Sequence, residues 1–388
     1  MISVFENHTL QELALLTEEL VKNNIIAPEY YQKFGVKRGL RNDDGSGVVA
    51  GLTNICNVHG FVMSEGEKAP AKGSLTYRGI PIEALVNGCQ EEDRFGFEEV
   101  IWLLLFGDLP HQAQLERLRA ILSELRVVPE SFSIDMLMKA PSPNIMNKLA
   151  RAVLALYSYD PNPEELSLSN LLRQSLCLIA MAPAIVSIAY QVKRRYYDGK
   201  SLFIHPNDKR LTIAESLLSS IRLDQQFTKQ EARLLDLCLM LHAEHGGGNN
   251  STFACRVLTS SGTDTYSAIA AAIGSLKGPR HGGANQKVSE MVEMLKESVS
   301  NTEDEDQVAE YLRKLIRREA GDRSGLIYGM GHAIYTLSDP RAVILRDQAS
   351  RLAKGTPWEA ELELLKKIER LAPIAFHEMK DDGKYICA

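Results

Sequence analysis

Apolar residues recur at helical spacing through most of the chain. Side chains three or four residues apart lie on one face of a helix. The pattern predicts helices over residues 10–20, 97–106, 115–125, 145–157, 211–223, 265–276, 286–299, 308–318 and 342–354. A Thr228–Glu231 capping box predicts one more helix, which ends at the glycines 246–248. Most of the chain is therefore expected to be helical.

The most apolar helix is predicted over residues 168–192, and Pro183 within it predicts a kink or a break. Its apolar run, residues 176–190, is short for a membrane span, so a buried core helix is the interpretation. We expect no membrane association.

Extended structure is predicted only near the N-terminal end. Residues 48–62 and 75–80 are rich in β-prone side chains with glycine breaks, which is typical of a few short strands. Strands and helices do not alternate as a parallel sheet requires. The fold class is therefore mainly α, with minor β-strands around residues 48–80.

Composition narrows the class of protein. The chain has 388 residues, about two domains by length. It is 45% hydrophobic with a formal net charge of -6, which favours a globular protein that does not bind nucleic acid. The six cysteines form no CxxC pair, and no basic and apolar leader opens the chain. A cytoplasmic location is expected.

Three short motifs place a histidine beside glycines, at residues 241–249, 277–285 and 328–335. Glycine lets the backbone approach a ligand closely, and histidine is the side chain most easily tuned for proton transfer near neutral pH. Three such motifs indicate one convergent polar site.

Each motif residue also has a simpler structural interpretation. His242 and His245, three apart on a helix, could share a metal ion, but no HExxH accompanies them, so hydrogen bonding at a helix end is favoured. His281 would lie at a helix N-terminus, where the helix dipole disfavours a charged imidazole, or would only cap that helix. Arg341 could clamp a carboxylate or be a solvated charge.

Together the motifs closely resemble those of the citrate synthase family. The matching segments read HAEHGGGN at 242–249, AAAIGSLKGPRHGGAN at 270–285 and GMGHAIYTLSDPR at 329–341. Weaker matches lie at 37–40, at 75–79 (LTYRG) and at 97–110, so the resemblance runs from about residue 35 to the end.

The resemblance implies a mostly helical homodimer with the active site in a cleft. We assign residues 1–277 to a large domain and 278–388 to a smaller mobile domain. The implied reaction joins acetyl-CoA to oxaloacetate and hydrolyses the citryl thioester, with no cofactor and no metal. Propionyl-CoA, giving 2-methylcitrate, is the alternative acyl donor.

Roles follow from the resemblance, residue by residue. His281 would hydrogen-bond the thioester oxygen as the enol forms, and His332 would polarise the ketone of oxaloacetate. His245 and Arg341 would hold oxaloacetate. The residues implied for CoA binding are Arg38, Leu326, Gly329, Met330, Gly331 and Lys384.

The chain departs from the family pattern in two places. The family's catalytic base is an aspartate in a segment that would follow Ala388, and neither Asp381 nor Asp382 fits that motif. This gives the hypothesis that the chain is catalytically weak, or a truncated, non-catalytic dimer that binds oxaloacetate or CoA. In addition, Thr336 stands where many members have an arginine that contacts CoA.

Overall fold

A computed structural model describes residues 29, 33, 53–64, 67–332 and 334–379. The chain divides into two compact units, residues 1–52 and 53–388. All described residues except Glu29 and Lys33 belong to the second unit. The predictions for the helix at 10–20, Arg38 and Lys384 therefore lie outside the described residues, as do Asp381 and Asp382.

One antiparallel sheet holds the described strands, in the order β1-β2-β3. The strands are β1 Cys56–Ser64, β2 Glu67–Tyr77 and β3 Ile80–Pro81. The first two form a long hairpin, with a register shift between His59 and Phe61. The predicted minor β-strands near the N-terminal end are confirmed, but β2 begins earlier than expected, at Glu67, because residues 67–74, with their lysines and glycine, carry little β signal by themselves.

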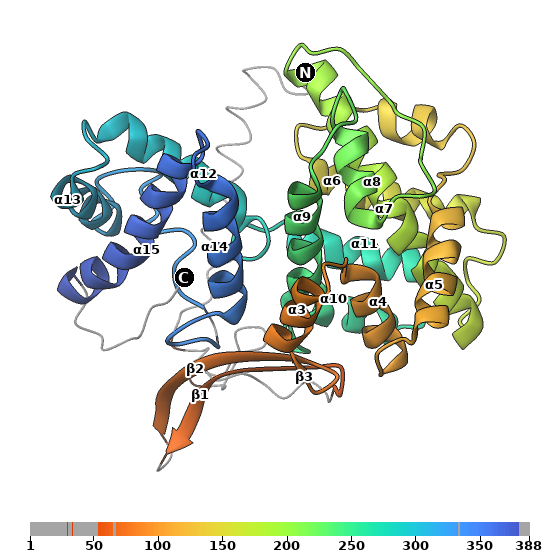
Figure 1. Cartoon of the computed structure of the whole chain (residues 1–388), viewed down its shortest axis with the longest axis horizontal. Helices are drawn as coiled ribbons and strands as arrows, with labels where there is room; N and C mark the ends of the chain where they lie inside the picture. Colours follow the sequence, from red (N-terminus) through yellow and green to blue (C-terminus); the bar gives the residue numbers. More distant parts are fainter. Residues whose placement is uncertain (1–28, 30–32, 34–52, 65–66, 333, 380–388) are drawn as a thin grey trace. The chain divides into compact units, whose positions relative to one another are not determined.

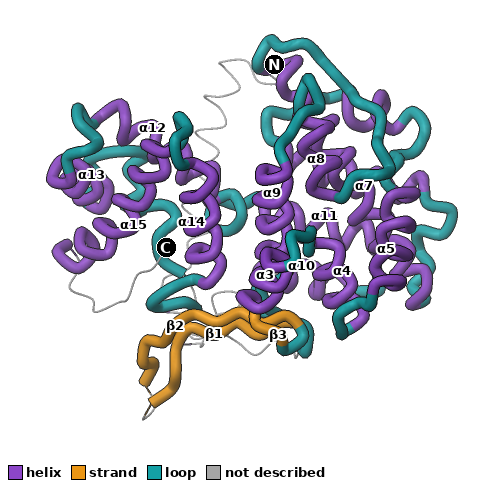
Figure 2. Tube along the Cα trace, in the orientation of Figure 1, coloured by secondary structure: helices purple, strands orange, loops and turns teal. Residues whose placement is uncertain are grey.

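The rest of the described chain is helical, which confirms the predicted mainly α fold (Figures 1 and 2). The helices before residue 277 are α3 Ile82–Glu91, α4 Phe97–Phe106, α5 Gln112–Leu125, α6 Ile145–Leu156, α7 Leu168–Tyr197, α8 Ile213–Ile221, α9 Lys229–His242, α10 Asn250–Thr259 and α11 Thr265–Leu276. They are followed by α12 Ala284–Ser298, α13 Glu305–Ile316, α14 Pro340–Ala353 and α15 Glu359–Met379. A π-helical turn, Ser133–Met138, and a 3-10 turn, Tyr157–Tyr159, precede α7.

Helix α7 runs unbroken for 30 residues with Pro183 inside it. Of the predicted kink or break, the break was therefore wrong, and the kink stays a prediction. One lost backbone hydrogen bond is tolerated because α5, α6 and α8 pack along the helix. Among the described helices, α7 is the one whose length and composition would allow a membrane span. Half of that stretch is buried, as expected for a core helix.

Two hydrophobic cores flank the motifs. Side chains of α3, α4, α9 and β2, including Tyr77 and Leu241, form one core, and Ile344 and Leu345 of α14 pack against it. Helices α12, α13 and α15 form another around Leu295. Because α14 contacts both α9 and α15, the domain boundary at 277/278 stays a prediction.

Candidate active site

The loop that carries His245 follows the end of α9 and is fixed by two side chains. Fully buried Tyr77 places its hydroxyl 3.0 Å from the Met240 carbonyl oxygen and 3.1 Å from that of Glu244. The Glu244 carboxylate accepts from the backbone N–H of His245 (3.1 Å) and of Gly246 (2.7 Å). His245 therefore lies beyond the helix, and the prediction that it shares a helix face with His242 was wrong.

The loop that carries His332 defines the tautomer of that histidine. Gly329 and Gly331, before it, adopt φ of +84° and +87°, where glycine is favoured. His332 Nδ1 accepts from the backbone N–H of Ile334 and of Tyr335, each at 3.1 Å. A ring nitrogen that accepts two amide protons carries no proton itself, so the proton is on Nε2. The ring can therefore donate a hydrogen bond from Nε2.

The β1–β2 hairpin holds the residues that follow His332. The Thr336 hydroxyl donates to the Gly60 carbonyl and accepts from the Ala71 backbone N–H (3.2 Å). A Cβ on Gly60 would come within 2.6 Å of the Tyr335 Cα, and one on Gly73 within 2.1 Å of the Ser338 carbonyl oxygen. The two glycines therefore let the loop lie directly against the hairpin.

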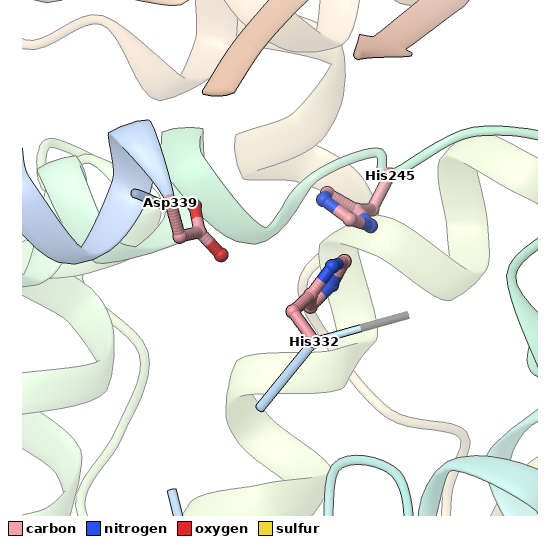
Figure 3. Close-up of side chains that lie close together, drawn as sticks. All are labelled: His245, His332 and Asp339. Atoms are coloured by element: carbon pink, nitrogen blue, oxygen red, sulfur yellow. The ribbon is translucent and has the colours of Figure 1, made fainter. Parts of the chain in front are cut away.

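These loops bring His245 and His332 together. Their ring centroids are 5.2 Å apart and nearly perpendicular, at 88°. The Tyr335 ring lies 4.6 Å from that of His332, and its hydroxyl is 3.2 Å from His245 Nε2. In Figure 3 the two imidazoles face each other, and Asp339 approaches from the start of α14.

Arg341 lies in the first turn of α14, paired with Asp339, the N-cap of the helix. Its Nε is 3.1 Å from Asp339 Oδ1, and its Nη2 is 2.6 Å from Oδ2. Burial opposes ionisation of Asp339, but the guanidinium outweighs it and holds the carboxyl pKa below its usual value. Asp339 thus occupies the Nε–Nη2 edge of the guanidinium, whereas Nη1 forms no hydrogen bond with a described residue.

Burial and the positive charge of Arg341 keep His245 neutral. Burial is the larger cause, and together they lower the pKa of His245 to about 3. The site therefore places two uncharged imidazoles near one guanidinium at neutral pH, an arrangement that can donate hydrogen bonds to a carbonyl oxygen and bind a carboxylate.

His281 lies in the turn before α12, as predicted. Its Nε2 is 2.9 Å from the Ser251 hydroxyl at the start of α10, and burial lowers its pKa. Among the described residues, its hydrogen bonds do not reach His245, His332 or Arg341. The structure thus brings three of the four predicted residues together and leaves His281 in a separate contact.

The chemistry of the donors argues against a metal centre. His245, His332 and Asp339 have potential ligand atoms within 4.8 Å of one another. A metal ligand needs a lone pair, but the Nε2 of His332 carries the proton, and both oxygens of Asp339 bind Arg341. His242 lies outside the cluster, and its Nδ1 contacts the Cys238 carbonyl (2.7 Å), as the hydrogen-bonding interpretation expected.

The described residues predicted to bind CoA lie in the loop between α13 and α14. Leu326 is exposed, whereas Met330 packs against the α12–α13–α15 core. The neighbouring Tyr328 hydroxyl donates to Asp322 (2.6 Å). No contact tests a role for Leu326, Gly329, Met330 or Gly331 in CoA binding, so these assignments stay predictions.

Sequence reasoning missed Tyr335 and Asp339 as parts of the site. In the sequence, Tyr335 has the pattern of an apolar loop residue. It contacts His245, which lies 90 positions earlier in the chain. Asp339 followed by Pro340 is a common signal for the start of a helix. That signal does not indicate the ion pair of Asp339 with Arg341.

Comparisons with known proteins agree with the fold and the motifs. The family profile described as "Citrate synthase, C-terminal domain" matches residues 42–386, so the chain belongs to the citrate synthase family. It is 34% identical over 348 residues to a citrate synthase of Acidithiobacillus ferridurans, covering 86% of this chain and 81% of that one. It is 30% identical over 341 residues to 2-methylcitrate synthase 1 of Corynebacterium glutamicum, covering 86% and 79%. The crystal structure of the Pyrobaculum aerophilum citrate synthase superposes with a TM-score of 0.65 at 25% identity, covering 86% of this chain and 81% of that one.

Proposed function

We propose that this protein is an acyltransferase that condenses acetyl-CoA with oxaloacetate to give citrate and CoA. The observation that carries the proposal is the tautomer of His332: its Nδ1 is occupied by two backbone amides, so Nε2 is a donor beside neutral His245 and Arg341. Membership of the citrate synthase family supports the reaction class.

The site residues would contact two groups of oxaloacetate, its ketone oxygen and one carboxylate. The Nε2–H of His332 would donate to the ketone oxygen as charge develops there, and the open edge of Arg341 would bind a carboxylate. A fixed donor in a buried site stabilises an oxyanion far more than water does. Holding the substrate by its carboxylate also sets the angle of attack.

His281 would serve the second substrate. The imidazole of His281 precedes α12 and is held by the Ser251 hydroxyl of α10. In its neutral form it can donate a hydrogen bond to a thioester oxygen while the methyl group loses its proton. The loop at 326–331 would then bind the nucleotide end of CoA. These roles follow the family resemblance.

The acyl donor has two candidates, since one relative is a citrate synthase and another a 2-methylcitrate synthase at similar identity. Acetyl-CoA is our first choice. Initial rates of CoA release with acetyl-CoA and propionyl-CoA would rank the two. A higher kcat/KM for propionyl-CoA would make the protein a 2-methylcitrate synthase instead.

We also propose a homodimer in the cytoplasm. Helix α10 has no buried residue, α11 buries only Tyr266 and Ala268, and these two helices pack with α6 in one apolar layer. Val257 and Leu154 of this layer are about half exposed, at 49% and 50%, a surface that a second copy would cover. The five described cysteines are free thiols, as in a reducing compartment.

The function is tested by purified protein, oxaloacetate and acetyl-CoA, with CoA release followed by a thiol reagent. Turnover that is lost in His332→Ala would support the proposal. Absence of turnover together with calorimetric binding of oxaloacetate would instead make the chain a non-catalytic binder.

A further inference from the structure

A cavity lies between α3, α9 and α14, and none of the candidate active-site histidines lines it. Its volume is about 330 Å³, within the range of small-molecule sites. Its base is apolar, and three guanidinium groups and three amides surround it: Gln90, Arg94, Gln230, Arg233, Gln348 and Arg351. An apolar base with a few convergent polar groups is the usual form of a ligand site.

Arg233 of α9 lines the cavity with a guanidinium whose hydrogen bonds are only partly satisfied. Asp93 pairs with its Nη1, which fixes the guanidinium, while Nε and Nη2 are buried and have no hydrogen-bond partner among the described residues. Unsatisfied buried donors cost about 1–3 kcal/mol each. The Nε–Nη2 edge is the edge that grips a carboxylate or phosphate bidentately.

Of the three guanidinium groups around the cavity, those of Arg94 and Arg233 are paired with carboxylates, and that of Arg351 forms no ion pair with a described residue. Arg94 is engaged with Glu92 (2.7 Å) and Glu99, but Arg351 is exposed on α14. Asp236 is the one carboxylate among the described residues that line the cavity, and it accepts from the backbone N–H of Gly96 (2.8 Å) and Phe97 (3.2 Å). Burial raises the pKa of Asp236 to about 7, so it carries only part of a negative charge at neutral pH.

The two helices that supply Arg233 and Arg351 also carry the candidate active site. Helix α9 leads into the His245 loop, and α14 begins with Asp339 and Arg341, and the two helices contact each other (Figure 1). Ten helical residues from Arg351 back to Arg341 span about 15 Å. An anion that joins the two arginines would therefore fix the spacing of the elements that hold the substrate.

We propose that this cavity binds a small organic anion, with a phosphate or carboxylate head and an apolar body, and that its occupancy changes the affinity for oxaloacetate. Binding in the cavity is independent of the proposed function, whereas the coupling to oxaloacetate rests on it. Coupling between two sites is reciprocal, so oxaloacetate would change the affinity for the anion by the same factor.

Calorimetry on the full chain tests the binding, with phenyl phosphate and phenylacetate as probes for the two head groups. We expect at least one to bind with a Kd below about 1 mM, and Arg351→Gln to weaken it roughly tenfold. Arg346→Gln is the matched control, because Arg346 is on the same helix but pairs with Glu369 (2.8 Å) and does not line the cavity. Failure of both probes to bind, or equal effects of the two variants, would overturn the proposal.

The coupling is tested by repeating the oxaloacetate titration with the bound probe at saturation. We expect a changed Kd for oxaloacetate in the wild type and a smaller change in Arg351→Gln at the same probe concentration. An unchanged wild-type Kd would refute the regulatory role while leaving the anion site in place. Neither titration needs turnover, so a failure of the proposed catalytic function would be seen separately.

Discussion

The hydroxyl of Tyr335 lies 3.2 Å from Nε2 of His245, and this contact joins two of the three histidine motifs. Tyr335 is only 1% exposed, and its ring also packs 4.6 Å from that of His332. The contact sets the orientation of His245, since a ring nitrogen bound to a fixed hydroxyl cannot rotate without losing the bond.

Replacing Tyr335 with phenylalanine should therefore loosen His245 and leave the packing intact. We expect KM for oxaloacetate to rise roughly fivefold to tenfold, in line with about 1 kcal/mol for one hydrogen bond. CoA-release kinetics would measure this, with thermal melting to check the fold. An unchanged KM would mean that the Tyr335 hydroxyl does not position His245.

Thr336 should act as a positioning residue, because its hydroxyl both donates to Gly60 and accepts from Ala71. Thr336→Val keeps the shape but loses both bonds, so the loop that carries His332 should detach from the hairpin. We expect kcat to fall roughly tenfold, and Thr336→Ser, which keeps the hydroxyl, to recover most of it. Equal activity of the valine and serine variants would contradict this role.

The Arg341→Lys variant tests whether binding of oxaloacetate requires the planar guanidinium. Lysine keeps the charge but cannot bind Asp339 and a substrate carboxylate along two edges at once. We expect at least a tenfold rise in KM for oxaloacetate, about 1.4 kcal/mol or more. Arg351→Lys on the exposed part of α14 is the control and should leave KM within about twofold in the absence of added anion.

The pH dependence of stability should report the buried His245. Its folded pKa of about 3 lies below the ordinary histidine pKa of 6.5, so between these values the unfolded state binds more protons. The free energy of unfolding should therefore fall as the pH falls from about 6.5 toward 3, and this loss should be smaller in His245→Asn. Urea unfolding at pH 7, 5.5 and 4.5 gives the comparison. Parallel slopes for the two proteins would exclude a depressed pKa at His245.

Chelation should have no effect on activity, since the hydrogen bonds of His332 and Asp339 occupy the lone pairs that a metal would need. We expect the same rate of CoA release before and after dialysis against EDTA. A loss of activity that zinc or iron restores would refute the assignment of His332 as a hydrogen-bond donor and of Asp339 as the ion-pair partner of Arg341.

The sequence predicts the fold class well because local signals mark the helices. The Thr228–Glu231 capping box lies where expected, and the helix predicted over residues 265–276 is α11. The hairpin could not be foreseen, because β2 is specified by its pairing with β1 and by the contacts of Gly60 and Gly73 with the His332 loop. The glycine contacts join residues more than 260 positions apart.

The motifs name residues that the structure brings together, but they do not give the geometry of the contact. The histidine motifs name His245 and His332, but the helical periodicity extends α9 too far, because the hydroxyl of Tyr77, a residue from β2, ends it at His242. Tyr335 and Asp339 are recognised as parts of the site only from their contacts with His245 and Arg341. The spacing of the motifs does not predict these contacts.

The central claim is that Nε2–H of His332 donates to the ketone of oxaloacetate, and carbonyl NMR tests it directly. With oxaloacetate labelled at C2 by carbon-13, we expect the ketone resonance to move to higher chemical shift on binding to the wild type, as polarisation withdraws electron density. In His332→Ala the bound ligand should lose most of that shift. A bound ketone with the chemical shift of free oxaloacetate in the wild type would contradict the account.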